Sequence, residues 1–175
     1  MPIRKIEVMS RANAVWLFAR QFAERPDPPI TAIISISNID QSSPDFNMDG
    51  ANGLVESCLL SFDDVECGEK GCIIEQDADR IASFVRSIEN RDDIERLVVH
   101  CGAGVSRSAG VAAACSLYLL GNDSEFFGAK YCPNRTCYRM VLDSLLVPLT
   151  GTQIDERFGR NKELYWARRR EELGI

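Results

Sequence analysis

The segment from Leu97 to Leu120 constrains the fold more than any other part of the chain. Residues 97–100 form an apolar run typical of a buried strand, and residues 108–120 are almost wholly apolar and predict a buried helix. The two are joined by a turn that contains Gly102 and Gly104. A helix that follows a buried strand this closely packs back onto the sheet, so the segment predicts an α/β layer fold.

The same alternation runs through the rest of the chain. Apolar and β-branched runs predict further strands at residues 3–9, 31–37 and 57–62. Polar caps and apolar residues at helical spacing predict helices at 10–22, 75–90, 134–145 and 155–173. We therefore predict one three-layer α/β/α domain over residues 1–175, with a central, mainly parallel sheet of four to five strands flanked by helices.

Composition and charge restrict the partners and the location. The 175 residues carry a formal net charge of −6, which argues against a general nucleic-acid partner. The first ten residues lack the apolar core of a secretion signal, and the longest apolar stretch, 109–120, is too short to span a bilayer. With seven cysteines at irregular spacing, we expect a cytoplasmic protein with free thiols and no membrane partner. We also expect a monomer.

The turn after the central strand has the features of an anion-binding loop. The first amides of a helix have no partner within the helix, and the helix dipole adds positive charge at the same place. Glycines let the backbone curl so that successive N–H groups point inward. Arg107, in the first helical turn, can clamp two oxygens of a bound oxyanion. The predicted phosphate-binding residues are Gly102, Ala103, Gly104, Val105, Ser106 and Arg107.

Cys101 is expected at the bottom of this loop as the nucleophile. The donors that bind phosphate also stabilise a thiolate, and a thiolate facing a phosphate can attack phosphorus. Ser108 can donate its hydroxyl to the sulfur and ease its departure. His100, the only histidine, is expected to hold the loop by hydrogen bonds to backbone carbonyls rather than to act as the base. The alternative is that Cys101 is a buried core thiol and the glycines form a simple turn. This alternative does not explain why the cysteine, the arginine and the start of the helix occur together at this spacing.

The stretch HCGAGVSRS at 100–108 resembles the signature of the cysteine-based protein phosphatases, most closely the small dual-specificity branch. The resemblance is strong over this stretch with its flanking strand and helix, and it extends more weakly over residues 31–146. It implies a dual-specificity-phosphatase-like fold, a phosphocysteine intermediate, no metal or other cofactor, and a separate aspartate as general acid.

The general acid is sought among aspartates upstream of Cys101. Asp63 and Asp64 directly follow a predicted strand, at the sheet edge where α/β sites assemble, whereas Asp77 and Asp79 begin a helix and are expected to cap it. Strand alternation does not decide between the first two. The Phe-Asp-Asp-Val stretch resembles the family pattern in which the second aspartate is the acid, which favours Asp64 and gives it the role of base toward water afterwards.

The loop composition indicates the substrate class. No charged residue lies between Cys101 and Arg107, unlike in phosphoinositide-directed relatives, and Ser106 replaces the asparagine of RNA triphosphatase relatives. We expect a phosphoprotein or phosphopeptide substrate, with phosphotyrosine first and phosphoserine or phosphothreonine as further substrates. Two alternatives stay open. One is a phospho-residue-binding pseudophosphatase; the other is a thiol redox or arsenate-reducing protein, which needs a resolving cysteine near Cys101.

Four further features have expected roles. Cys67 and Cys72 lack the histidines of a zinc site and are considered as oxidation partners of Cys101. Residues 38–53 are expected to form a loop along one wall of the cleft. The charged C-terminal helix is predicted to be solvated and to contain internal ion pairs. Tyrosines at three positions are expected to be packing residues: Tyr131, Tyr138 and Tyr165.

Overall fold

The structure is a computed structural model that describes residues 3–24, 28–46 and 53–175, with the backbone alone for 20–24. Its elements are, in chain order, β1 (Lys5–Ser10), α1 (Arg11–Glu24), β2 (Thr31–Ser37), β3 (Leu54–Ser61), α2 (Glu75–Glu89), β4 (Arg96–Cys101), α3 (Arg107–Leu120), the 3-10 helix η1 (Ser124–Phe127), α4 (Arg135–Leu145) and α5 (Gly151–Leu173).

The four described strands form one parallel sheet in the order β1-β4-β2-β3. Strand β2 is buried along its whole length, as expected for a β-branched, apolar run in the middle of a parallel sheet. Because the strands are parallel, their carboxyl ends meet at one edge, where Ser10, Ser37, Ser61 and Cys101 end β1, β2, β3 and β4. The sheet with helices on both faces confirms the predicted three-layer α/β/α fold.

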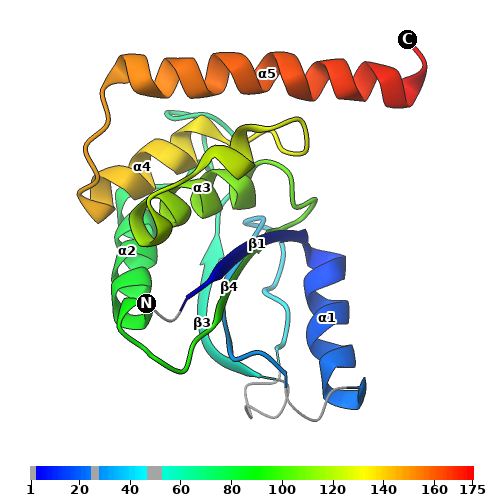
Figure 1. Cartoon of the computed structure of the whole chain (residues 1–175), viewed down its shortest axis with the longest axis vertical. Helices are drawn as coiled ribbons and strands as arrows, with labels where there is room; N and C mark the ends of the chain where they lie inside the picture. Colours follow the sequence, from blue (N-terminus) through cyan, green and yellow to red (C-terminus); the bar gives the residue numbers. More distant parts are fainter. Residues whose placement is uncertain (1–2, 25–27, 47–52) are drawn as a thin grey trace.

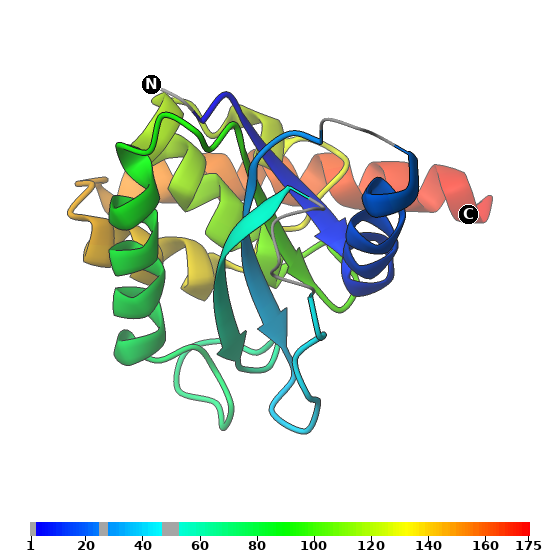
Figure 2. The same cartoon turned by 90° about the horizontal axis from the view of Figure 1, so that it is seen from below.

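The helices divide the core into two parts. Helices α2 and α3 cover one face of the sheet, and α4 packs against both of them. Helix α1 covers the other face, where Phe18 packs against Phe46 and the buried side chains of Ile33 and Val98. Helix α5 lies outside α3 and α4, across the top of Figure 1, and contacts η1. Figure 2 shows α1 on the opposite side of the sheet from α2.

The caps explain where the helices begin. Ser10 accepts from the N–H of Asn13 and Asn134 from that of Cys137, so both predicted caps are confirmed. The predicted start of α5 is wrong by four residues, because Thr150 and Gln153 form a capping box that begins the helix at Gly151. Strand β3 begins earlier than expected, at Leu54, and η1 was not predicted.

No helix of the described segments is both long enough and apolar enough to cross a membrane. The expectations of a cytoplasmic location, a monomer and one domain over residues 1–175 stay predictions.

Helices α3 and α4 meet closely at Gly110. A Cβ added there would lie 2.5 Å from the carbonyl oxygen of Asn134 and 3.2 Å from Cβ of Cys137. We predict that Gly110→Ala lowers the free energy of unfolding by about 1–3 kcal/mol, because the added methyl group forces the helices apart. Urea denaturation measures this change.

Gly159→Ala is the matched control. It lies on the exposed side of α5 with no atom within 4 Å of an added Cβ, and alanine there should raise the free energy of unfolding by about 1 kcal/mol through helix propensity. Equal stability of Gly110→Ala and wild type would contradict the close helix approach.

Candidate active site

The loop Gly102–Ser106 joins the end of β4 to the start of α3 and surrounds a pocket of about 480 Å³. Cys101 lies at the pocket's floor, where its side chain is buried. Its Sγ is 3.1 Å from Oγ of Ser108, within hydrogen-bonding distance for sulfur. The structure thus brings the predicted nucleophile and its predicted hydroxyl partner into contact.

Three carbonyl groups of the loop accept hydrogen bonds from residues outside it. The oxygen of Gly102 accepts from the N–H of Arg11 at 3.1 Å, that of Val105 from Cys132 at 3.1 Å, and that of Ser106 from Asn134 at 3.0 Å. The N–H groups of residues 102–106 donate to no other residue that the structure describes. This is the arrangement of an anion-binding loop, in which donors stay available for a ligand.

Gly104 lets the loop pack against the end of β1. It has φ +71, and a Cβ on it would lie 2.3 Å from the carbonyl carbon of Met9 and 2.4 Å from the nitrogen of Ser10. Both the left-handed conformation and this close approach require glycine. At Gly102, by contrast, a Cβ would meet only Nη2 of Arg107, at 3.7 Å, so this position has room for a side chain.

Arg107 is held from below by the ends of two strands. Its Nη1 donates to the carbonyl oxygen of Phe62 at 2.6 Å and to that of Ser37 at 3.4 Å. The side chain is 5% exposed, and its Nε has no hydrogen-bond partner among the described residues. A buried guanidinium nitrogen is rarely left without an acceptor, so this Nε is a donor available to a bound oxyanion.

The structure gives the two adjacent aspartates different positions. Oδ1 of Asp64 accepts from Oγ of Ser106 at 2.8 Å and from Nδ2 of Asn134 at 3.0 Å, and Asp64 lines the pocket. Asp63 instead accepts from the N–H of Ile39 at 3.2 Å and lies against Gly71, away from the lining of this pocket. Asp64 is therefore the aspartate that lines the pocket, and Asp63 connects two loops outside it.

His100 does not make the carbonyl hydrogen bonds expected of it. Neither ring nitrogen has a partner in the described part of the chain, and the ring packs edge to face against Phe46 with centroids 5.6 Å apart. The side chain is fully buried between the sheet and the α1 side of the core. Burial lowers the pKa of His100 to about 4, partly offset by the backbone of Cys101, so the ring is neutral at pH 7.

Cys132, and not Cys67 or Cys72, shares the pocket of Cys101, and the buried Cys137 interacts electrostatically with Cys101. All seven cysteines are free, and Cys67 lines a different pocket, beside Thr136 and Arg139. Cys132 lines the pocket of Cys101. Burial and the charge of Asp64 raise the pKa of the Cys132 thiol, which keeps it protonated and a poor partner in thiol exchange.

Helix α5 forms a wall of the pocket that the sequence analysis missed. Tyr165, Trp166 and Arg169 line it, although Tyr165 was expected to be a packing residue. Most of α5 is exposed, as predicted for a solvated helix. The predicted internal ion pairs are confirmed, since Arg168 and Arg169 both bind Glu172. Tyr131 and Tyr138 are buried as expected. The sequence signal that could have indicated this wall was the adjacent aromatic pair Tyr165 and Trp166 within an otherwise charged helix.

Residues 38–53 do not provide this wall where they are described. None of residues 38–46 or 53 lines the pocket, and 47–52 lie outside the described residues. Within the described ranges, no three His, Cys, Asp or Glu side chains are grouped as a metal site.

No protein-family model and no curated protein matches this chain. The likeness of residues 100–108 to the cysteine-based phosphatases therefore stays a prediction from the sequence.

The buried His100 predicts a pH dependence of stability. Its folded-state pKa of about 4 lies below its unfolded value of 6.5, so the unfolded chain binds more protons between these pH values. Stability from this group is complete above pH 6.5 and is lost as the pH falls toward 4, by an amount of about 3 kcal/mol. Urea titrations from pH 7 to pH 4 measure the loss.

His100→Asn is the control, and only the pH dependence is compared because the substitution itself alters stability. Its unfolding free energy should fall less steeply than that of wild type below pH 6.5. Parallel curves for the two proteins would show that folding does not lower the pKa of His100.

Proposed function

We propose that this protein is a metal-independent phosphoric monoester hydrolase of the cysteine-based, dual-specificity type, acting on phosphotyrosine and also on phosphoserine or phosphothreonine in proteins. One observation carries the proposal: the sulfur of Cys101 lies at the floor of a pocket in which the loop N–H groups and Nε of Arg107 have no partner among the residues that the structure describes. These donors match the oxygens of a phosphate placed against the sulfur.

In the first step the thiolate of Cys101 attacks phosphorus. A sulfur–phosphorus bond forms while the ester oxygen–phosphorus bond breaks, and Asp64 gives its proton to the departing oxygen. The hydrogen bonds from Ser106 and Asn134 to Oδ1 of Asp64 fix the carboxyl group at the pocket. The three phosphate oxygens stay bound to the loop N–H groups and to Arg107.

In the second step water attacks the phosphocysteine. Asp64, now ionised, takes a proton from the water, and the phosphorus–sulfur bond breaks to release inorganic phosphate. The hydroxyl of Ser108, 3.1 Å from Sγ, donates to the departing thiolate and lowers the cost of the negative charge on it. The cycle returns every group to its starting state and requires no metal or redox cofactor.

Hydrolysis of para-nitrophenyl phosphate in the presence of EDTA tests the reaction. We predict turnover that EDTA leaves unchanged and that Cys101→Ser abolishes, because a serine hydroxyl is not ionised at neutral pH. Turnover retained by Cys101→Ser would contradict the assignment of the nucleophile. A folded wild-type protein that binds inorganic phosphate without turnover would favour the pseudophosphatase.

The neighbouring aspartates give a matched pair of variants. We predict that Asp64→Asn lowers kcat about 100-fold or more, because no acid remains to protonate the leaving oxygen. Asp63→Asn should stay within a few-fold of wild type, since the amide oxygen can still accept from Ile39. Steady-state kinetics on an alkyl and an aryl phosphate measure both. The reverse result, with Asp63→Asn inactive, would exchange the two roles.

A further inference from the structure

The wall formed by α5 has no part in the chemistry proposed above, yet it faces the nucleophile. Tyr165, Trp166 and Arg169 share the pocket with Cys101 and Arg107. We propose that these three α5 side chains select the substrate: the two aromatic rings hold the ring of a phosphotyrosine, and Arg169 binds an acidic residue beside it in the peptide. This inference rests on the proposed function, because it concerns the same site.

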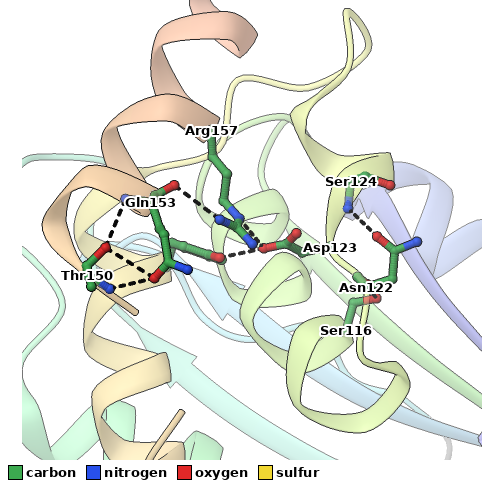
Figure 3. A network of polar contacts seen from close by, with 8 residues as sticks. Ser116, Asn122, Asp123, Ser124, Thr150, Gln153 and Arg157 are labelled. Atoms are coloured by element: carbon green, nitrogen blue, oxygen red, sulfur yellow. Dashed lines mark hydrogen bonds and ion pairs between the residues drawn. The ribbon is translucent and has the colours of Figure 1, made fainter. Parts of the chain in front are cut away.

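The first half of α5 is fixed firmly to the rest of the protein. Arg157 binds the carboxylate of Asp123 at 2.9 Å, and the hydroxyl of Tyr138 donates to the same carboxylate. Figure 3 shows Arg157 reaching down from α5 to Asp123, with Gln153 and Thr150 at the start of the helix. Burial and Asp123 raise the pKa of Tyr138, which keeps its hydroxyl a donor.

Asn161 connects α5 to the phosphate-binding loop. It is 2% exposed, and its Nδ2 donates to the carbonyl oxygens of Gly128 at 2.9 Å and Tyr131 at 2.8 Å. The next residue after Tyr131 is Cys132, whose N–H donates to the carbonyl oxygen of Val105 in the loop. Two hydrogen bonds, from Asn161 to Tyr131 and from Cys132 to Val105, thus fix the position of α5 relative to the loop.

Helical spacing also determines which side chains in the second half of α5 face the rest of the protein. Phe158, Asn161, Tyr165 and Arg169 follow one another at intervals of three or four residues and so share one face of the helix. Phe158 and Asn161 on that face are anchored, Phe158 through ring contacts with Phe127 at 5.1 Å. Tyr165 and Arg169 therefore face the body of the protein at the pocket.

The rings suit an aromatic leaving group. Tyr165 and Trp166 lie edge to face with centroids 5.4 Å apart, and Trp166 is 49% exposed at the rim, whereas Cys101 is 2% exposed at the floor. A phosphotyrosine spans this depth with a flat ring that can pack on both side chains. Phosphoserine has no ring, and its short side chain would bring the peptide backbone down to the rim.

Arg169 supplies the charge at the entrance. Its Nη1 binds Glu172 at 2.9 Å, but the side chain is 45% exposed and also lines the pocket, so it can bind a second carboxylate. Arg168 is bound to the same Glu172 and does not line the pocket. An acidic residue next to the phosphotyrosine is therefore expected to contact Arg169 specifically.

Kinetics on matched peptides test the selection. Four peptides of one sequence carry phosphotyrosine or phosphoserine, each with acidic or neutral flanks. We predict that Trp166→Ala lowers kcat/KM for phosphotyrosine peptides about 3- to 10-fold through KM and leaves phosphoserine peptides unchanged. Arg169→Gln should lower kcat/KM about threefold for acidic peptides alone. The controls, Trp16→Ala on α1 and Arg168→Gln, should match wild type.

Two kinetic outcomes would overturn the proposal. An equal loss on phosphotyrosine and phosphoserine peptides in Trp166→Ala would indicate a structural role for the wall, and no loss on either would remove its role. Inhibition by inorganic phosphate reports whether the loop itself is intact in each variant.

A binding measurement separates this inference from the catalytic one. The chain has two tryptophans, so in Trp16→Phe/Cys101→Ser the tryptophan fluorescence comes from Trp166 alone. We expect the phosphotyrosine peptide to change this fluorescence at lower concentration than the phosphoserine peptide. If the peptides show this preference but wild type is catalytically inactive, the proposed hydrolase function is wrong and the proposed substrate selection by α5 stands. If wild type turns over substrate but the fluorescence shows no preference for the phosphotyrosine peptide, the hydrolase function stands and the proposed selection by α5 is wrong.

Discussion

A buried cation is the constraint on which the rest of the site depends. Arg107 is 5% exposed, and its described hydrogen bonds go to main-chain oxygens of Phe62 and Ser37, with no carboxylate paired to it in the described part of the chain. Burying a charge in this way is costly unless an anion shares the site. The proposed function meets this cost with the bound phosphate, whose negative charge lies against Arg107 in the complex.

The parallel sheet lets all four strands serve this one site. The end of β4 carries Cys101, the ends of β2 and β3 hold Arg107, and the end of β1 packs against Gly104. Residues after α3 complete the shell, since Cys132 and Asn134 bind carbonyl groups of the loop. Each of these bonds occupies a carbonyl acceptor of the loop, and this supports the proposed preference of the site for an anion.

The outermost layer has a different role from the sheet. Helix α5 is attached through a buried polar cluster of Asp123, Tyr138 and Arg157 and through Asn161, whose bonds end one residue before Cys132. Buried polar groups of this kind accept few alternative arrangements, so they specify one position for a helix that hydrophobic packing alone would hold less uniquely. The wall that α5 adds is thus part of the fold, and in the proposed function it contacts the substrate without taking part in the bond-breaking steps.

Sequence by itself determined the strands, most helices and the anion-binding loop, because a β-branched run, an N-cap or a glycine between strand and helix acts within a few residues. For the same reason it placed Cys101, Arg107 and Ser108 together at this loop, where the structure also has them. The sequence favoured Asp64 over Asp63 only through a family resemblance. Only the tertiary structure showed the contact of Asp64 with Ser106, which joins residues 42 apart. The same is true of Cys132, of Tyr165, Trp166 and Arg169 at the pocket, and of the unpartnered His100 ring. Their roles depend on which distant elements pack together, and no local pattern in the chain encodes that.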